Sequence, residues 1–165
     1  MTAPVKGLAE LRAEIDAVLA DWAWHLDHRE YDNLVELFTE DALFISGAAE
    51  LRGRAAIKTR YLERPVVRTT RHMYSGLRIT EVEGGTDRGP GTEIAPGITR
   101  PAVVRACSTW VNYAVNGPAV VDDVGVYLVA DFGDVLTWCA DSRWRISERR
   151  IIPVFRDPAR APITA

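Results

Sequence analysis

Among the side chains that could transfer a proton near neutral pH, four stand out: Asp27, which lies at the end of a predicted helix, and the three histidines, His25, His28 and His72. A histidine can accept a proton when a carboxylate holds its tautomer and stabilises the imidazolium ion that forms. Asp27 and His72 would make such a pair, although they lie in different predicted elements. Both also have structural interpretations, because Asp27 could cap the next helix or pair with an arginine, and His72 could be a core histidine.

The direction of the His72 side chain is ambiguous in the segment "TRHMYSGLRIT". In a regular strand, Met73 and Leu77 share one face and His72 points to the other. If the apolar face packs in the core, His72 faces outward. A β-bulge near Ser75 and Gly76 would reverse this, as would a sheet that is covered on both faces.

A metal site is not predicted. The spacing of His25, His28 and His72 is not that of a zinc site, and no second pair of ligands follows. Cys107 and Cys139 are too widely spaced for a disulfide framework and lie in apolar, strand-like segments, so we expect them to pack.

Other residues could line a binding pocket. Side chains that could donate a hydrogen bond to a substrate oxygen are those of Tyr31, Tyr74, Tyr113 and Asn112. Tryptophans that could surround a flat or cyclic ligand are Trp22, Trp24 and Trp110, together with Trp138 and Trp144. A packed core would explain most of these aromatic residues equally well.

Three helices are predicted in the N-terminal part of the chain, and the first of them carries Asp27. Apolar residues recur at three- and four-residue spacing over residues 8–28, which predicts an amphipathic helix with Asp27 at the border of its apolar face. A second, short helix is predicted over residues 30–38 and a third over residues 51–64, beginning near Gly53. Between them, "ALFIS" reads as a short strand.

The second half of the chain is rich in β-branched and aromatic residues, broken by turn signals. Long strands are predicted over residues 69–80, 100–115, 124–138 and 143–155. Helices followed by consecutive strands indicate an α+β fold with an antiparallel sheet. Residues 81–99 are dense in Gly and Pro and read as a long loop, which could be a lid or a simple hairpin connection.

The last of these strands carries several arginines. "SRWRISERR" alternates charged and apolar residues like a strand with one face in water, and we expect that face to hold Arg143, Arg145, Arg149 and Arg150.

Composition excludes several classes of protein. The 165 residues are 47% apolar and 26% charged, as in soluble globular proteins, and the net charge of −3 offers no basic surface for nucleic acid. No apolar run approaches the roughly 20 residues that a membrane-spanning helix needs, and the N-terminal segment does not read as a signal peptide. We therefore expect a cytoplasmic protein that binds neither nucleic acid nor membrane.

Three segments, "LDHREYDNLVELFTEDALF", "RHMYSGLRIT" and "RWRISERRI", occur in the order and approximate separation found in the nuclear transport factor 2-like superfamily. Over nearly its whole length the chain resembles the SnoaL-like group within it. The resemblance implies a cone-shaped α+β fold, also called cystatin-like, in which three N-terminal helices pack on a curved, mainly antiparallel sheet and enclose a pocket. We expect one SnoaL-like domain spanning residues 1–165.

The resemblance also implies an activity. In the dehydratase and dehydrochlorinase members, which resemble scytalone dehydratase and hexachlorocyclohexane dehydrochlorinase, an Asp late in the first helix orients a His on the first long strand, and that His removes a substrate proton. Asp27 and His72 match these positions, which implies that His72 faces the pocket. Trp22 and Trp24 depart from the pattern, because they stand where other members place polar ligand groups.

The strand over residues 100–115 has no second histidine, so a second acid would have to be Tyr31, Tyr74 or Asn112. We expect a cofactor-independent lyase or isomerase that acts on a small apolar or cyclic substrate, with His72 as base and Asp27 orienting it. Tyr31 or Tyr74 would donate to the developing oxyanion or leaving group. By family resemblance we also expect a homodimer or homotrimer.

A rival expectation comes from the same segments. They are similar to the small β subunit of aromatic-ring-hydroxylating dioxygenases, which shares the fold, does no chemistry itself and binds a large subunit that carries iron. A third alternative is a ligand-binding or dimer-forming module on this fold.

Overall fold

The structure is a computed structural model and describes residues 6–84, 93–95, 98–99, 101–122 and 125–162. Its elements are, in chain order, α1 (Lys6–Asp27), α2 (Tyr31–Glu36), β1 (Phe38–Ser46), β2 (Ala49–Arg52), α3 (Gly53–Leu62), β3 (Arg68–Gly84), β4 (Glu93–Ala95), β5 (Ile98–Thr99), β6 (Pro101–Asn116), β7 (Val126–Trp138), β8 (Trp144–Arg156) and the 3-10 helix η1 (Pro158–Arg160).

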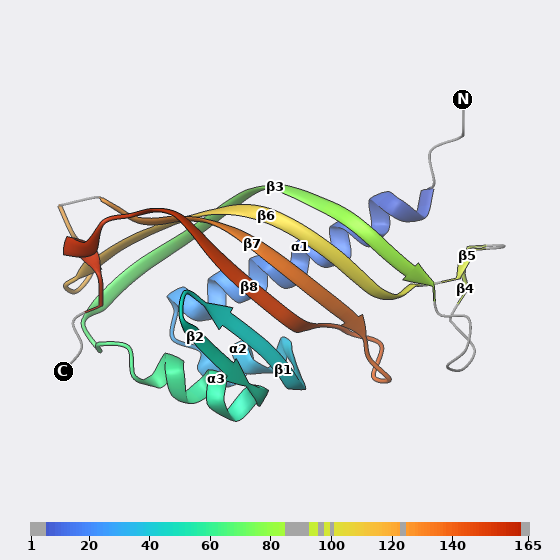
Figure 1. Cartoon of the computed structure of the whole chain (residues 1–165), viewed down its shortest axis with the longest axis horizontal. Coiled ribbons are helices and arrows are strands. Elements are labelled where there is room, and N and C mark those ends of the chain that lie inside the picture. The colour runs from blue at the N-terminus through green and yellow to red at the C-terminus, as the bar shows by residue number, and fades with distance from the viewer. Residues whose placement is uncertain (1–5, 85–92, 96–97, 100, 123–124, 163–165) are drawn as a thin grey trace.

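Six of the strands form one curved sheet in the order β2-β1-β8-β7-β6-β3. All neighbours are antiparallel except β1 and β8, which run parallel, and β4 and β5 pair separately. Helix α1 runs along one face of the sheet, while α2 and α3 gather at the end that carries β1 and β2 (Figure 1). The predicted α+β architecture, with three helices on a mainly antiparallel curved sheet, is confirmed.

Helix α1 is held by its apolar stripe. The stripe buries residues at helical spacing: Leu11, Ile15, Leu19, Trp22 and Leu26. They join the main core with inward-facing residues of the sheet, including Trp110, Phe132 and Ile146. The helix ends at Asp27, and Arg29 then adopts a left-handed conformation with φ of 61° that turns the chain into α2. The last turn of α1 thereby lies against β3, with Asp27 facing that strand.

A bulge in β3 decides which way His72 points. The register between β3 and β6 shifts between Ser75 and Arg78, and Gly76 has φ of +65°, a conformation that glycine adopts without strain. Before the bulge His72 faces the helices and Met73 faces solvent; after it, Leu77 is buried. The histidine and the later apolar residues therefore share the inner face, as the bulge interpretation predicted.

A second bulge, in β8, contradicts the prediction for Arg149. Val135 pairs with Glu148 but the next residue of β7, Leu136, pairs with Ile146, so Ser147 is an extra residue in β8. Because of this insertion Arg149 lies on the same face as Ile146 and is fully buried. The expectation that Arg149 belongs to a wet face is wrong; Arg150, which follows it, is exposed.

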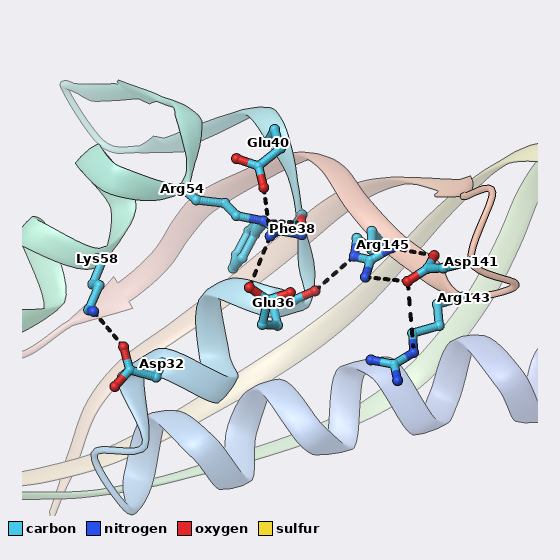
Figure 2. Close-up of polar contacts among 9 residues, drawn as sticks. All are labelled: Asp32, Glu36, Phe38, Glu40, Arg54, Lys58, Asp141, Arg143 and Arg145. Atoms are coloured by element: carbon cyan, nitrogen blue, oxygen red, sulfur yellow. Dashed lines mark hydrogen bonds and ion pairs between the residues drawn. The ribbon is translucent and has the colours of Figure 1, made fainter.

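Arg54 ties α3 to the segment between α2 and β1 (Figure 2). Its guanidinium donates to the Phe38 carbonyl at 2.8 Å and to the carboxylates of Glu36 and Glu40 at 3.0 and 2.8 Å. Lys58 of the same helix pairs with Asp32 of α2.

From β8, Arg145 donates to the Glu36 carbonyl at 3.0 Å and is held by Asp141 at 2.6 and 2.7 Å (Figure 2). These bonds fix α2 and α3 against the end of the sheet, and α3 contributes one wall of the cavity described below.

Several predicted boundaries change. Residues 37 and 38 leave the second helix because the Leu37 carbonyl accepts from Ile146 N and Phe38 begins β1. Residues 51 and 52 belong to β2, a four-residue strand too short to show a pattern, and α3 begins at Gly53 as predicted.

The predicted loop over residues 81–99 is partly strand, since β3 continues to Gly84 and β4 and β5 follow. The idea of a lid concerns mainly residues 85–92 and 96–97, which lie outside the described residues.

Cys107 and Cys139 are free and half-buried, as expected of packing residues. Of the helices that the structure describes, none has the length and apolar character needed to span a membrane.

Candidate active site

Asp27 and His72 are in direct contact. His72 Nδ1 lies 2.7 Å from Asp27 Oδ1, and the His72 backbone N–H donates to Asp27 Oδ2 at 2.7 Å. The Thr70 hydroxyl donates to Asp27 Oδ1, also at 2.7 Å. Only 5% of the Asp27 side chain and 7% of the His72 side chain is exposed. The end of α1 and the inner face of β3 thus hold the carboxylate at three points.

The charge state of the pair follows from its surroundings. Burial raises the pKa of Asp27, but the hydrogen bonds from His72 and Thr70 outweigh it, so the pKa is below its ordinary value and the group is ionised. Burial lowers the pKa of His72, and although Asp27 opposes this, the charges of Arg64 and Arg149 add to it, so the imidazole is neutral at pH 7.

An ionised carboxylate accepts the proton on Nδ1, which leaves the lone pair on Nε2. No described residue bonds to Nε2. The ring edge of His72 meets Trp22, with the ring centroids 5.5 Å apart.

His72 lines a cavity of about 400 Å³, within the range of small-molecule sites. The cavity lies between α1, α3 and the sheet, and residues of the C-terminal segment line one end of it. Its apolar wall includes Trp22, Leu26, Phe44, Trp110, Leu128, Ala130, Phe132 and Ile151. Its polar wall includes Tyr61, Arg64, Arg68, Asn112 and Tyr127. A largely apolar molecule with a few polar groups fits such a lining.

Several polar atoms in and beside this wall are buried without a hydrogen-bond partner among the described residues. They are Trp22 Nε1, Tyr61 Oη, Arg68 Nη2, Asn112 Oδ1 and Arg149 Nη1. Trp22 approaches Tyr61 closely enough to lower its pKa slightly, yet the two groups do not reach hydrogen-bond geometry. Unsatisfied buried groups are rare in folded proteins, and a cluster of them around one cavity indicates a polar ligand or water there.

The structure brings some of the predicted site residues together. Trp22, Trp110 and Asn112 line the cavity with His72, and Asn112 lies directly across from His72 in the β3–β6 register. Asp27 lies behind the imidazole rather than in the cavity wall.

The other residues that the sequence suggested for a pocket do not line this cavity: Trp24, Tyr31, Tyr74, Tyr113, Trp138 and Trp144. Trp24 is 58% exposed and stacks on His28. Tyr74 stacks on Trp110, but its hydroxyl donates to the Asp16 carbonyl and carboxylate at 2.9 and 3.0 Å. Tyr31 is buried, stacks on Tyr61 and accepts from Arg29 at 3.3 Å.

The remaining histidines lie apart from the cavity. His25 bonds to Glu30 at 2.6 Å, and His28 to the Trp24 carbonyl at 2.8 Å. Within the described part of the chain, no group of three His, Cys, Asp or Glu side chains is arranged to hold a metal ion.

Tyr61, Arg64 and Arg68 were not predicted from the sequence. Arg68 could have been found, since strand alternation places residues 68, 70 and 72 on one face. Tyr61 lies one helical turn after the buried Ile57, which is also a signal. Burial raises the pKa of Tyr61 to about 12, so its hydroxyl keeps its proton and can donate.

A family model described as a SnoaL-like domain matches residues 8–150. No curated protein matches the sequence significantly.

Among solved structures, a protein from Novosphingobium aromaticivorans proposed to be a scytalone dehydratase superposes with a TM-score of 0.68 at 18% identity, covering 96% of this chain and 92% of its own. A protein from Catenulispora acidiphila, in complex with S-DNPA, gives 0.67 at 24% identity and covers 88% and 94%. The β subunit of a proposed aromatic-ring-hydroxylating dioxygenase from N. aromaticivorans gives 0.68 at 16% identity and covers 96% and 100%.

At these identities the structural matches establish the fold alone, which is the predicted nuclear transport factor 2-like, cystatin-like fold. The family model covers most of the sequence, and on that ground the chain belongs to the SnoaL-like domain family.

Proposed function

We propose that the protein is a cofactor-independent enzyme that removes a proton from carbon in a small, largely apolar substrate, as the first step of an elimination or isomerisation. His72 is the general base and Asp27 orients it and stabilises the imidazolium ion. The observation that carries the proposal is the 2.7 Å contact between His72 Nδ1 and an ionised Asp27 at the wall of the cavity. It leaves an unprotonated Nε2 that no residue in the described part of the chain bonds to, as a base requires.

Removing a proton beside a carbonyl or leaving group creates negative charge elsewhere on the substrate, and a donor must meet it. Tyr61 suits this role better than Tyr31 or Tyr74, because it lines the cavity, its hydroxyl keeps its proton, and that hydroxyl has no hydrogen-bond partner among the described residues. We therefore assign the donor role to Tyr61. The relative proposed to be a scytalone dehydratase and the relative bound to a small molecule agree with chemistry or binding in such a cavity.

The test needs no knowledge of the product. A panel of aryl ketones and other carbon acids is incubated with the protein in D₂O, and loss of the C–H signal is followed by NMR. Elimination and isomerisation both begin with removal of this proton, so the C–H signal is lost whether the carbanion takes up deuterium or goes on to product. We expect His72→Ala and Asp27→Asn to slow it by about 10²–10⁴-fold, the usual contribution of a positioned base.

The matched control is His28→Ala, which removes a histidine outside the cavity and leaves the rate unchanged. We call Asp27 and His72 the dyad. If exchange in both His72→Ala and Asp27→Asn were as fast as in the unmodified protein, the assignment of His72 as base would be refuted.

A second candidate function has its own observation. The chain covers the whole of the dioxygenase β subunit with which it superposes, so a non-catalytic subunit is the main alternative. That function requires a larger iron-containing partner, which would co-purify at native expression. A stable homo-oligomer without such a partner, measured by light scattering, would favour the enzyme.

A further inference from the structure

Three arginines meet where α1, α3 and β3 come together, and all their hydrogen-bond acceptors are neutral. Arg64 donates to the Leu26 carbonyl at 3.2 Å and the Thr70 hydroxyl at 2.9 Å. Arg29 donates to the carbonyls of Pro65 and Arg68 at 2.6 and 2.8 Å. Arg68 donates to Asn116 Oδ1 at 2.8 Å, and its guanidinium lies 5.0 Å from the centre of the Tyr127 ring.

The described residues balance the positive charge of this cluster only in part. The ionised Asp27 offsets some of the charge of Arg64, but its oxygens are bonded to His72 and Thr70, and no described carboxylate forms an ion pair with Arg29, Arg64 or Arg68. Burial lowers the pKa of both Arg64 and Arg68; the charge of Arg29 adds to the effect on Arg64, and that of Arg64 to the effect on Arg68. Like charges held together in a partly dry site disfavour one another, and an anion would relieve them.

Arg68 is the member of the cluster that is open to a ligand. It lines the cavity, is only 5% exposed, and its Nη2 finds no acceptor among the described residues. A buried guanidinium without a counter-ion costs free energy unless a partner arrives. Among the described residues of the cavity wall the one acid is Glu63, which is more than half exposed and pairs with Arg60.

The strand geometry relates this cation to the proposed base. Arg68 and His72 lie on the same face of β3 four residues apart, which separates their Cα atoms by about 13 Å. The cavity wall near these two residues includes the neutral Asn112 and the rings of Trp22 and Trp110. A molecule that reaches both ends has a polar, negatively charged end and an apolar body.

We propose that the substrate is an apolar, ring-bearing carboxylic acid whose carboxylate binds Arg68, with Arg64 adding positive charge, and whose acidic C–H lies at His72. The placing of the C–H rests on the proposed function, whereas the carboxylate site stands without it. Arg68 Nη1 is held by Asn116, whereas Nη2 is buried without an acceptor among the described residues and is the nitrogen that would donate to the carboxylate.

Binding, rather than turnover, tests the site. Phenylacetate, 3-phenylpropanoate and 4-phenylbutanoate are titrated by calorimetry into the full chain, each beside its primary amide, which has nearly the same shape and no charge. We expect the best acid to bind at least about tenfold more tightly than its amide, as a charge-assisted bond in a dry site allows. Arg68→Met should bring the ratio close to one and leave the affinity of the amide unchanged.

The matched control is Arg71→Met, which removes the same charge from the exposed face of the same strand and should preserve the ratio. If Arg68→Met fails to fold, two other measurements still test the proposal. One is the acid-to-amide ratio of the unmodified protein, and the other is the ratio of Arg64→Met, which should be lower because Arg64 adds positive charge to the site.

Equal affinities of acid and amide, no binding of any acid in the millimolar range, or an equal loss in Arg71→Met would each overturn the proposal. Tighter binding of phenyl phosphate than of the best acid would overturn the carboxylate assignment. These results are independent of His72, so the carboxylate site can fail while the dyad retains its exchange activity, and the dyad can fail while acid selectivity remains.

Discussion

Replacing Asp134 by Asn should destabilise the protein strongly, because Asp134 is one half of a buried ion pair. Arg149 and Asp134 pair across β8 and β7 through two bonds, Nε to Oδ1 at 2.6 Å and Nη2 to Oδ2 at 2.9 Å. Their side chains are 0% and 1% exposed. The Arg149 guanidinium lies 4.4 Å from the centre of the Trp22 ring, so the pair also supports the cavity wall.

The magnitude follows from burial. Asn keeps the size of Asp134 but removes the negative charge, and leaves a guanidinium in the core without a counter-ion. Breaking a buried pair in this way costs about 3–5 kcal/mol. With a urea dependence of about 2 kcal/mol per molar, the unfolding midpoint should fall by about 1.5–2.5 M.

Urea unfolding followed by circular dichroism measures this shift, and the chain offers a matched control. Arg150 and Glu148, on the same strand, pair at 2.6 Å but are 51% and 31% exposed. Glu148→Gln should therefore cost less than about 1 kcal/mol. Replacing both members of the buried pair, in Asp134→Leu with Arg149→Met, should cost much less than Asp134→Asn, because no unpaired charge remains.

A loss below about 1 kcal/mol for Asp134→Asn, or one equal to that of Glu148→Gln, would refute the reasoning. It would mean that water or another group compensates Arg149 and that the pair is not as dry as its exposure indicates.

Two further predictions concern the dyad and its strand. The pKa of His72 is lower in the folded protein than its unfolded value of 6.5, so the unfolded chain binds more protons as the pH falls below 6.5. The free energy of unfolding should therefore decrease as the pH falls through this region. The pKa of Asp27 is also lowered, so a further loss of stability should follow below pH 3.8. Urea midpoints measured from pH 8 to 4 should show the loss that His72 causes in the unmodified protein but not in His72→Asn. Identical pH profiles of the two proteins would contradict this role of His72. Gly76→Val, at φ of +65°, should cost about 1–3 kcal/mol in urea unfolding, whereas Gly133→Val, which meets open space, should be tolerated. An equal loss of stability in the two variants would contradict the backbone strain that we expect at position 76.

The helices and long strands could be predicted because each is encoded locally. The stripe of α1 repeats every three to four residues, and the β-branched runs of β6 and β7 are long enough to be recognised alone. Element ends were less accurate, since Phe38 is drawn into β1 by pairing with Ile146, a residue more than 100 positions away. β2 went unrecognised because four residues carry almost no pattern.

For the candidate site, the sequence by itself determined the residue types that could transfer a proton, and family resemblance selected Asp27 and His72 from among them. Whether these two residues touch depended on the docking of α1 against β3. The directions of His72 and Arg149 depended on bulges at Ser75–Gly76 and at Ser147.

A bulge reverses every side chain beyond it, but it exists only through pairing with the neighbouring strand, so strand alternation could not reveal it. Likewise, only the tertiary structure shows that Arg68 has no carboxylate partner among the described residues. A charge on a strand lacks a counter-ion only when the residues that surround it, drawn from distant parts of the chain, are known.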